Sequence, residues 1–190
     1  GCERTAEDEL LRGDLLRRMG RMDEARRAFE SVESDARSAS RTAAVTALRR
    51  LAEMDEAESQ SYQDILRAYQ SIAASDPRDW TSRLAEAQLL LDKSRPREAY
   101  GAVQETLGLN PRCGQAWLLW GRLALMRFDF DGAEDTIAKL RDIVPDHPLA
   151  DLLEGEASLM QDEPQRALRA ARRTLAEIPD WPPGLALEAS

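Results

Sequence analysis

The chain has 190 residues, of which 43% are hydrophobic and 32% charged, and it carries a net charge of −9. Nucleic-acid binding needs a basic stripe that neutralises phosphates, so we expect no nucleic-acid partner. One candidate stripe exists on a predicted helix, and in so acidic a chain we interpret it as a solvated outer face; it consists of Arg166, Arg169, Arg172 and Arg173. No run approaches the ~20 apolar residues of a membrane helix, which predicts no direct membrane insertion.

The first predicted unit is a helical hairpin over about 6–39. Gly13, Gly20, Ala25 and Phe29 match the consensus of a 34-residue repeat that the later units also resemble. The stretch from Gly20 to Ala25 is interpreted as the turn between the two helices.

Residues 40–79 form an irregular unit, about six residues longer than the others. Between Ser31 and Asp76 there is no Gly and no Pro. Apolar spacing predicts helices over Thr42–Met54 and Glu56–Ser75, so the second helix of this hairpin is expected to be the lengthened one. Such a helix is either a spacer or an overhanging contact surface.

Four prolines stand 34 residues apart further along the chain: Pro77, Pro111, Pro145 and Pro179. Proline cannot continue a helix and restricts the residue before it, so each proline predicts the end of a unit. Three units follow from this period, over 80–113, 114–147 and 148–181. Small residues 12 apart are expected where the two helices of one hairpin approach closely, at Ala87/Ala99, Gly121/Ala133 and Gly155/Ala167.

Residues 182–190 are expected to form a partial or capping helix that begins at Pro182-Pro183, because proline is acceptable at a helix start. A chain cut from a longer protein explains this last segment equally well. The missing initial Met indicates processing or truncation at the other end.

This 34-residue pattern resembles the tetratricopeptide repeat, whose consensus places Trp, Leu-Gly, Tyr, Ala, Phe and Pro at intervals. Trp117, Gly121, Ala133 and Pro145 carry the resemblance in the middle unit. The resemblance covers nearly the whole chain and implies an all-α fold, a right-handed superhelical array of antiparallel helix hairpins. The units diverge from the consensus at the usual leucine and tyrosine places, which hold Glu86, Glu154, Leu90, Ala124 and Ser158.

In this family the first helix of each hairpin lines a concave groove that holds a partner. The fifth, ninth and twelfth places of three units would then form two leucine rows around one polar row, with two methionines beside them. These predicted partner-binding residues are Leu84, Gln88, Leu91, Leu118, Arg122, Leu125, Leu152, Glu156 and Leu159, together with Met126 and Met160.

Such a wall suits an amphipathic helix or an extended apolar peptide, and the methionines add adaptable contacts. It excludes the lysine and asparagine clamp with which some family members hold acidic chaperone tails. Two alternatives remain open: the leucines pack between helices, or they meet a second copy in a homodimer.

No catalytic or metal constellation is recognisable. The single histidine, His147, is expected to be a solvent-facing turn residue, and no His/Cys cluster has the spacing of metal ligands. We therefore expect neither an enzyme nor a cofactor, but a non-catalytic protein-interaction scaffold of bacterial origin.

Cys2 follows Gly1, where a bacterial lipoprotein carries its acylated cysteine. An ordinary cysteine after a leftover glycine explains the pair equally well. Cys113 lies far along the array, so we expect no disulfide with Cys2. The compartment is cytoplasmic or, if Cys2 is lipidated, periplasmic or anchored at the outer membrane. The alternatives to a free scaffold are a lipid-anchored periplasmic assembly factor and a regulatory segment of a larger enzyme.

Overall fold

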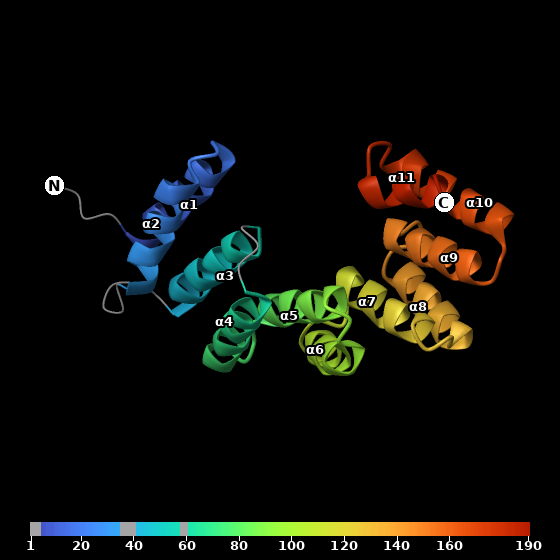
Figure 1. Ribbon diagram of the computed structural model, residues 1–190, viewed down its shortest axis with the longest axis horizontal. Coiled ribbons are helices and arrows are strands. Elements are labelled where there is room, and N and C mark those ends of the chain that lie inside the picture. Colours follow the sequence, from blue (N-terminus) through green and yellow to red (C-terminus); the bar gives the residue numbers. More distant parts are fainter. Residues whose placement is uncertain (1–4, 35–40, 58–60) are drawn as a thin grey trace. The chain divides into compact units, whose positions relative to one another are not determined.

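The computed structural model describes residues 5–34, 41–57 and 61–190 (Figure 1). In these ranges the chain forms eleven α-helices and no strand, so the all-α prediction is confirmed. Two compact units divide the chain, one ending at Leu89 and the other beginning at Leu90.

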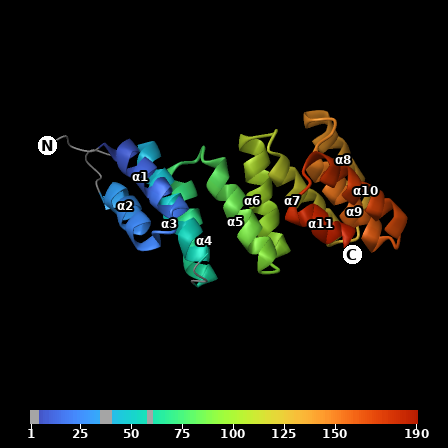
Figure 2. The ribbon, with the colours of Figure 1, turned by 90° about the horizontal axis from the view of Figure 1, so that it is seen from above.

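The first unit contains α1 (Ala6–Arg18), α2 (Met22–Ser34), α3 (Arg41–Ala57), α4 (Tyr62–Ser75) and most of α5 (Trp80–Asp92). A capping box starts α1: the Thr5 hydroxyl accepts the Asp8 N–H, and the Asp8 carboxylate accepts the Thr5 N–H. α1 and α2 lie side by side, with α3 packed against both (Figure 2). The fully buried Phe29 ring lies against Gly13, where an ideal Cβ atom would stand 2.4 Å from Phe29 Cε1.

The irregular hairpin differs from the prediction in its helix lengths. The first helix, α3, is the long one with 17 residues, and α4 has 14 residues and begins at Tyr62. The predicted helix over Glu56–Ser75 is therefore wrong at its start; residues 58–60 lie outside the described ranges. Ser61 is the N-cap of α4, with φ of −56° and ψ of 118°, so α4 begins where the sequence offers neither Gly nor Pro.

The second unit contains the end of α5 and six further helices. They are α6 (Pro96–Leu109), α7 (Gly114–Leu125), α8 (Phe130–Ile143), α9 (Pro148–Met160), α10 (Pro164–Glu177) and α11 (Pro182–Glu188). α7, α9 and α11 begin at the residues that the proline period predicts as the first of each unit. Prolines at the first positions of α6, α9 and α10 suit a helix start, where the amide they lack has no partner in the helix.

The turn inside each regular hairpin contains one residue in the left-handed region. Gly20 has φ of 74°, and Ser94, Phe128 and Asp162 have φ of 56° to 58°. All four occupy the fifteenth place of their repeats, so one turn geometry serves four hairpins. Glycine adopts it without strain, whereas an L side chain costs about 1–2 kcal/mol there.

In the second unit, successive hairpins pack closely against each other at glycines. An ideal Cβ atom on Gly121 would stand 2.2 Å from Leu153 Cδ2, and one on Gly155 would stand 2.2 Å from Leu187 Cδ2. Both leucines are buried and come from the next hairpin's first helix. The nearest side chain at these two glycines therefore comes from the following hairpin. The close approach of the two helices of one hairpin at Gly121/Ala133 and Gly155/Ala167 stays a prediction.

Candidate partner-binding site

The inner wall is the set of residues predicted to line the concave groove, and several of them belong to the hydrophobic core. Leu118, Leu125 and Leu152 are buried in one apolar cluster of the second unit, together with Leu149 and Leu153. An open wall is therefore the wrong interpretation for these three leucines, and the alternative of packing between helices holds for them. These leucines are buried because the first helices of successive hairpins pack against each other, α7 against α9 and α9 against α11.

The other apolar members of the wall differ in exposure. Leu91 and Leu159 are half-buried, and Leu159 packs against the same cluster. Met126 and Met160 are 49% and 44% exposed and stand one repeat apart at the ends of α7 and α9. In the first unit's part of α5, Leu84 and Gln88 are half-buried.

The polar row is occupied by an internal ion pair. Arg122 Nε and Nη2 donate to the two carboxylate oxygens of Glu156 at 3.0 and 2.5 Å. The hydrogen bonds from Arg122 to Glu156 outweigh burial and, with the negative charge of Asp92, raise the pKa of the guanidinium above its ordinary value. Both side chains are thus already engaged with each other.

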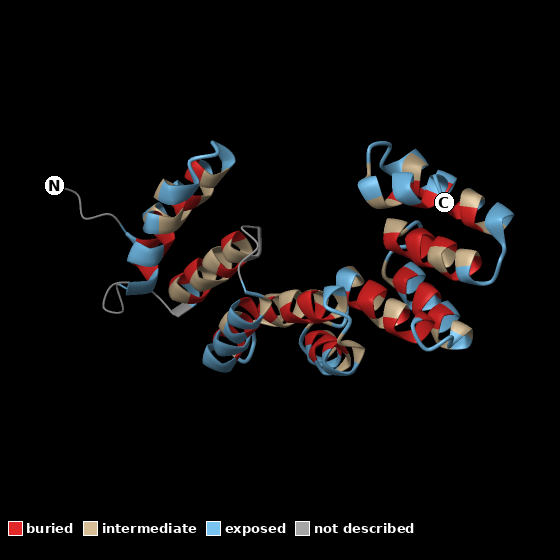
Figure 3. Cartoon of the chain, in the orientation of Figure 1, coloured by how far each residue is buried: buried red, intermediate tan, exposed pale blue. Residues whose placement is uncertain are grey.

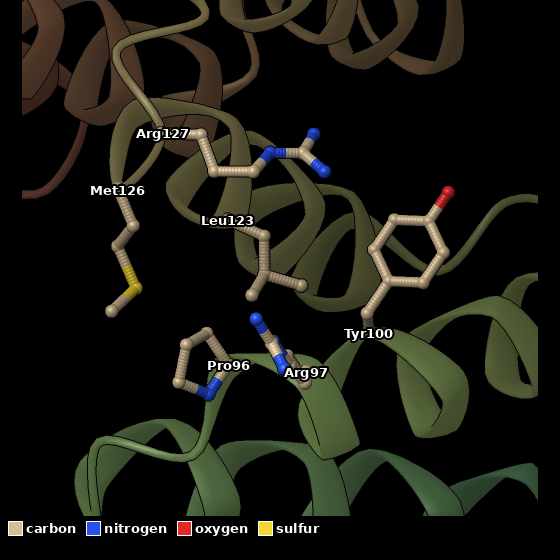
Figure 4. Close-up of a pocket in the computed structure, with 6 residues that line it drawn as sticks. All are labelled: Pro96, Arg97, Tyr100, Leu123, Met126 and Arg127. Carbon is tan, nitrogen blue, oxygen red and sulfur yellow. The ribbon is translucent and has the colours of Figure 1, made fainter.

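A pocket of about 480 Å³ opens beside Met126, between α6 and the end of α7 (Figure 4). Pro96, Arg97 and Tyr100 line it from α6, and they face residues from α7 and its C-terminal end, namely Leu123, Met126 and Arg127. The apolar part comes from Pro96, Leu123 and Met126. A small apolar cavity with a few polar groups at its edge is the usual form of a binding site.

Both charged residues of the pocket are arginines. Arg127 lies over the Tyr100 ring, with its guanidinium carbon 5.9 Å from the ring centroid, and its nearest carboxylate contact is Asp129 at 3.7 Å. The Tyr100 ring in turn packs on Trp120 at a centroid distance of 4.6 Å. These contacts hold Tyr100 and Arg127 at the pocket, and its two charged lining residues are both cationic although the chain is acidic.

Phe128 follows Arg127 and is 72% exposed in the left-handed turn position. It makes an edge contact with Phe130 at a centroid distance of 6.5 Å. Met126 and Phe128 are therefore two exposed apolar residues on either side of Arg127, and Met126 lines the pocket.

The arginine stripe of α10 is partly neutralised. Arg173 reaches Glu154 at 2.7 Å and Asp151 at 2.8 Å, and Arg166 binds Glu154 and Glu134. Arg141 of α8 also binds Asp151 and Glu154 of α9. Burial of Glu154 opposes its ionisation, but hydrogen bonds from Arg141 and Arg166 prevail and lower its pKa.

His147 has a structural role at the start of α9. His147 is half-buried, not solvent-facing: its Nδ1 accepts the Leu149 N–H at the start of α9, and burial lowers its pKa. Cys113 is a free, buried thiol, and Cys2 lies outside the described residues. Within the described ranges no His, Cys, Asp or Glu cluster could hold a metal ion, and none of the helices described there is long and apolar enough to cross a membrane.

Sequence reasoning did not find the pocket, although one signal was available. The fifteenth place of the first repeat holds Gly20, and the same place holds Phe128 in the third regular repeat. A bulky aromatic residue where glycine is favoured indicates a role other than folding. Arg97 and Tyr100 gave no such signal in the sequence, because only the packing of α6 against α7 brings them to the same pocket as Met126.

Comparison with known proteins agrees with the repeat pattern. A family model described as tetratricopeptide repeat matches residues 10–79 and 84–148. A search of curated proteins gives no match. Among solved structures, the chain resembles pilF of Pseudomonas aeruginosa (TM-score 0.74, 17% identity, 96% of this chain and 80% of that chain).

Two further structures show the same fold. One is TTC0263, a thermophilic protein of this repeat type from Thermus thermophilus, with a TM-score of 0.73, 19% identity, and 97% and 96% of the two chains covered. The other is YrrB, described as having an unusual peptide-binding site, with a TM-score of 0.63, 16% identity, and 97% and 92% covered.

Proposed function

We propose that this chain, which belongs to the tetratricopeptide repeat family, is a non-catalytic scaffold. In this proposal its second unit binds a linear segment of a partner protein. The fold supports a protein–protein interaction scaffold in general. The finer part of the proposal concerns where the partner binds and what chemistry it offers.

The binding site of this proposal is the pocket between α6 and α7 with the exposed Met126 and Phe128 at its edge. An apolar side chain of the partner enters the space among Pro96, Leu123 and Met126. Burying such a side chain contributes about 1.5–3 kcal/mol. Methionine adapts to different shapes, so the site accepts a range of apolar residues.

Charge sets the second requirement on the partner. Arg97 and Arg127 are the only charged residues among those that line the pocket, and both are cationic. A carboxylate next to the inserted side chain would meet guanidinium donors, which bind carboxylates by charge-assisted hydrogen bonds. The partner segment is therefore apolar with an adjacent acidic residue.

One observation carries the proposal: a pocket with an apolar part is edged by two arginines and lined by the exposed Met126, in a chain of net charge −9. The predicted inner-wall residues Arg122, Glu156, Leu159 and Met160 extend the site along α7 and α9. Because Arg122 and Glu156 bind each other, they would orient a partner only weakly.

The test is selection from a display library of random linear peptides on the whole chain. Enriched peptides should place Asp or Glu within two residues of a large apolar residue. The variant Arg97→Glu/Arg127→Glu should bind them at least about tenfold more weakly, the equivalent of ~1.4 kcal/mol.

The matched control is Arg112→Glu/Arg172→Glu, which changes the net charge equally at two exposed arginines outside the pocket. Equal loss of affinity in both variants would mean that only the overall charge matters. Binding that is unchanged in Arg97→Glu/Arg127→Glu would overturn the assignment of the site.

The two alternatives from the sequence, a lipid-anchored assembly factor and a segment of a larger enzyme, stay predictions. The first depends on Cys2, which lies outside the described residues.

A further inference from the structure

Arg127 lies between two groups that can engage its charge. Its guanidinium carbon is 5.9 Å from the centroid of the Tyr100 ring, and its Nη2 atom is 3.7 Å from Asp129 Oδ2. The second distance is too long for a hydrogen bond, and the Arg127 side chain donates none to any described residue. Figure 4 shows Arg127 extended toward Tyr100. Its guanidinium N–H groups are therefore available to a ligand in the pocket.

The Tyr100 ring is supported by Trp120. The two ring centroids are 4.6 Å apart, and the ring planes are inclined by 35°. Tyr100 comes from α6 and Trp120 from α7, and both are half-buried. Because the indole packs on the phenol ring, it restricts the rotation of Tyr100 and keeps this ring next to the Arg127 guanidinium.

Asp129 is kept from closing on Arg127 by its role in the next helix. Its Oδ1 accepts the Gly132 N–H at 2.9 Å and so caps α8. Residues 126–129 form an exposed turn, pale blue between α7 and α8 in Figure 3. A cation–π contact and an ion pair are both weak and of similar strength at exposed sites. The support of the Tyr100 ring therefore decides which of the two partners Arg127 takes.

The repeat itself does not require tryptophan at position 120. This residue stands seventh in its unit, where the following unit has Glu154 and the family consensus has leucine. The stacking of hairpins thus accepts other side chains at this place. What Trp120 adds is the ring contact with Tyr100.

We propose that Trp120, acting through Tyr100, is a positioning residue for Arg127, and that Arg127 so held selects partners with a carboxylate beside the inserted apolar side chain. Asp129 is the internal competitor of that carboxylate. Without the ring support, Arg127 closes on Asp129 and the pocket loses one of its two cations. This inference rests on the proposed peptide site and names the residues that set its preference for an acidic partner.

The first test compares two peptides on the whole chain. One is a display-selected peptide, called the acidic peptide; the amide peptide is identical except that Asn or Gln replaces its acidic residue. Trp120→Leu should bind the acidic peptide about threefold more weakly, the effect of one exposed cation–π contact. Its affinity for the amide peptide should not change. Trp120→Met replaces this variant if circular dichroism shows that leucine lowers the helicity.

Tyr100→Phe is the conservative control. It keeps the ring that contacts Arg127 and should prefer the acidic peptide as the wild type does. Tyr100→Leu removes the ring and should lose this preference.

The competitor is tested by a gain of affinity. Asp129→Asn keeps the cap of α8, because asparagine caps helices as well as aspartate does. It should bind the acidic peptide about threefold more tightly than the wild type. The gain should be larger in the background of Trp120→Leu, where Arg127 has closed on Asp129. Asp131→Asn is the matched control, since it removes one charge at an exposed residue that does not line the pocket.

A measurement without peptide follows Arg127 directly. In NMR spectra of the free chain, the side-chain signals of Arg127 should carry a ring-current shift from Tyr100, and Arg127→Lys identifies them. The shift should be lost in Tyr100→Leu and reduced in Trp120→Leu. A shift that Trp120→Leu leaves unchanged would show that Trp120 does not position Arg127.

The failure of this inference can be told from the failure of the peptide site. If the wild type prefers the acidic peptide but Trp120→Leu weakens both peptides equally, Trp120 is only structural and the site stands. If Asp129→Asn gains no more than Asp131→Asn, Asp129 is not a competitor. If the wild type binds both peptides alike, the charge requirement of the proposed function is wrong, whatever Arg127 contacts.

Discussion

Leu153 occupies the space beside Gly121 that any larger residue would need: an ideal Cβ atom on the glycine would stand 2.2 Å from Leu153 Cδ2. The same relation joins Leu187 to Gly155 one repeat later. The stacking of the second unit is thus a repeated insertion of leucine over glycine, and several expectations depend on it.

Gly121→Ala should lower the free energy of unfolding by about 1 kcal/mol. Alanine favours the helix by about 1 kcal/mol, but overpacking against the fully buried Leu153 costs about 1–3 kcal/mol. Gly101→Ala is the matched control, because its Cβ would meet nothing within 4 Å, and it should stabilise the chain. Urea unfolding measures both.

The same experiment has an internal check. In the background of Leu153→Ala the space beside Gly121 is open, so Gly121→Ala should become stabilising there. A glycine substitution that destabilises equally in both backgrounds would show that the leucine contact is not the cause.

Phe128→Gly should raise the free energy of unfolding by about 1 kcal/mol, since glycine tolerates the φ of 58° without strain. The exposed ring loses little packing when it is removed. We expect the variant to bind selected peptides more weakly, so that stability and binding change in opposite directions. Gly20→Ala is the reverse control and should destabilise the chain.

Arg122 and Glu156 should show a coupling energy of about 1 kcal/mol in a double-mutant cycle, because the pair is bidentate and partly shielded from solvent. Arg122→Glu places two carboxylates together and should destabilise the chain. The exchanged variant Arg122→Glu/Glu156→Arg should recover most of the loss. If the exchanged variant recovers no stability even at low salt, Arg122 and Glu156 do not form a direct ion pair.

Stability at acid pH should depend on Glu154. Its pKa is lower in the folded chain than in the unfolded chain, where a glutamate titrates near about 4.3. Above the pKa of the unfolded chain, ionised Glu154 makes its full contribution to the free energy of unfolding. This contribution is lost as the pH falls through the pKa of the folded chain. Urea unfolding from pH 7 to 3 should show a shallower acid loss in Glu154→Gln.

A second variant separates this cause from general acid unfolding. Arg141→Gln removes one hydrogen bond that keeps Glu154 ionised, so the acid loss should begin at higher pH. A profile identical to the wild type would mean that the network of Glu154 does not control acid stability.

The sequence predicted the regular helices well because proline and glycine act locally. Pro111, Pro145 and Pro179 end their units, and the next helices start three residues later, at Gly114, Pro148 and Pro182. Between Ser31 and Asp76 no such residue marks the turn, and there the predicted boundaries failed.

The candidate site was less predictable because exposure depends on neighbouring helices. The prediction set Met126 beside Leu125 among the partner-binding residues, yet Leu125 is 4% and Met126 49% exposed. Likewise, Tyr100 and Met126 share a pocket although nothing in their spacing along the chain indicates it.

The most direct test of the peptide site is a methyl NMR titration of the chain labelled at its five methionines. With a peptide taken from the display selection, the Met126 signal should shift most, while the buried Met54 signal should stay in place. A shift at Met160 would add the inner side of α9 to the site. If the peptide binds and Met126 does not shift, the pocket between α6 and α7 is not where the partner binds.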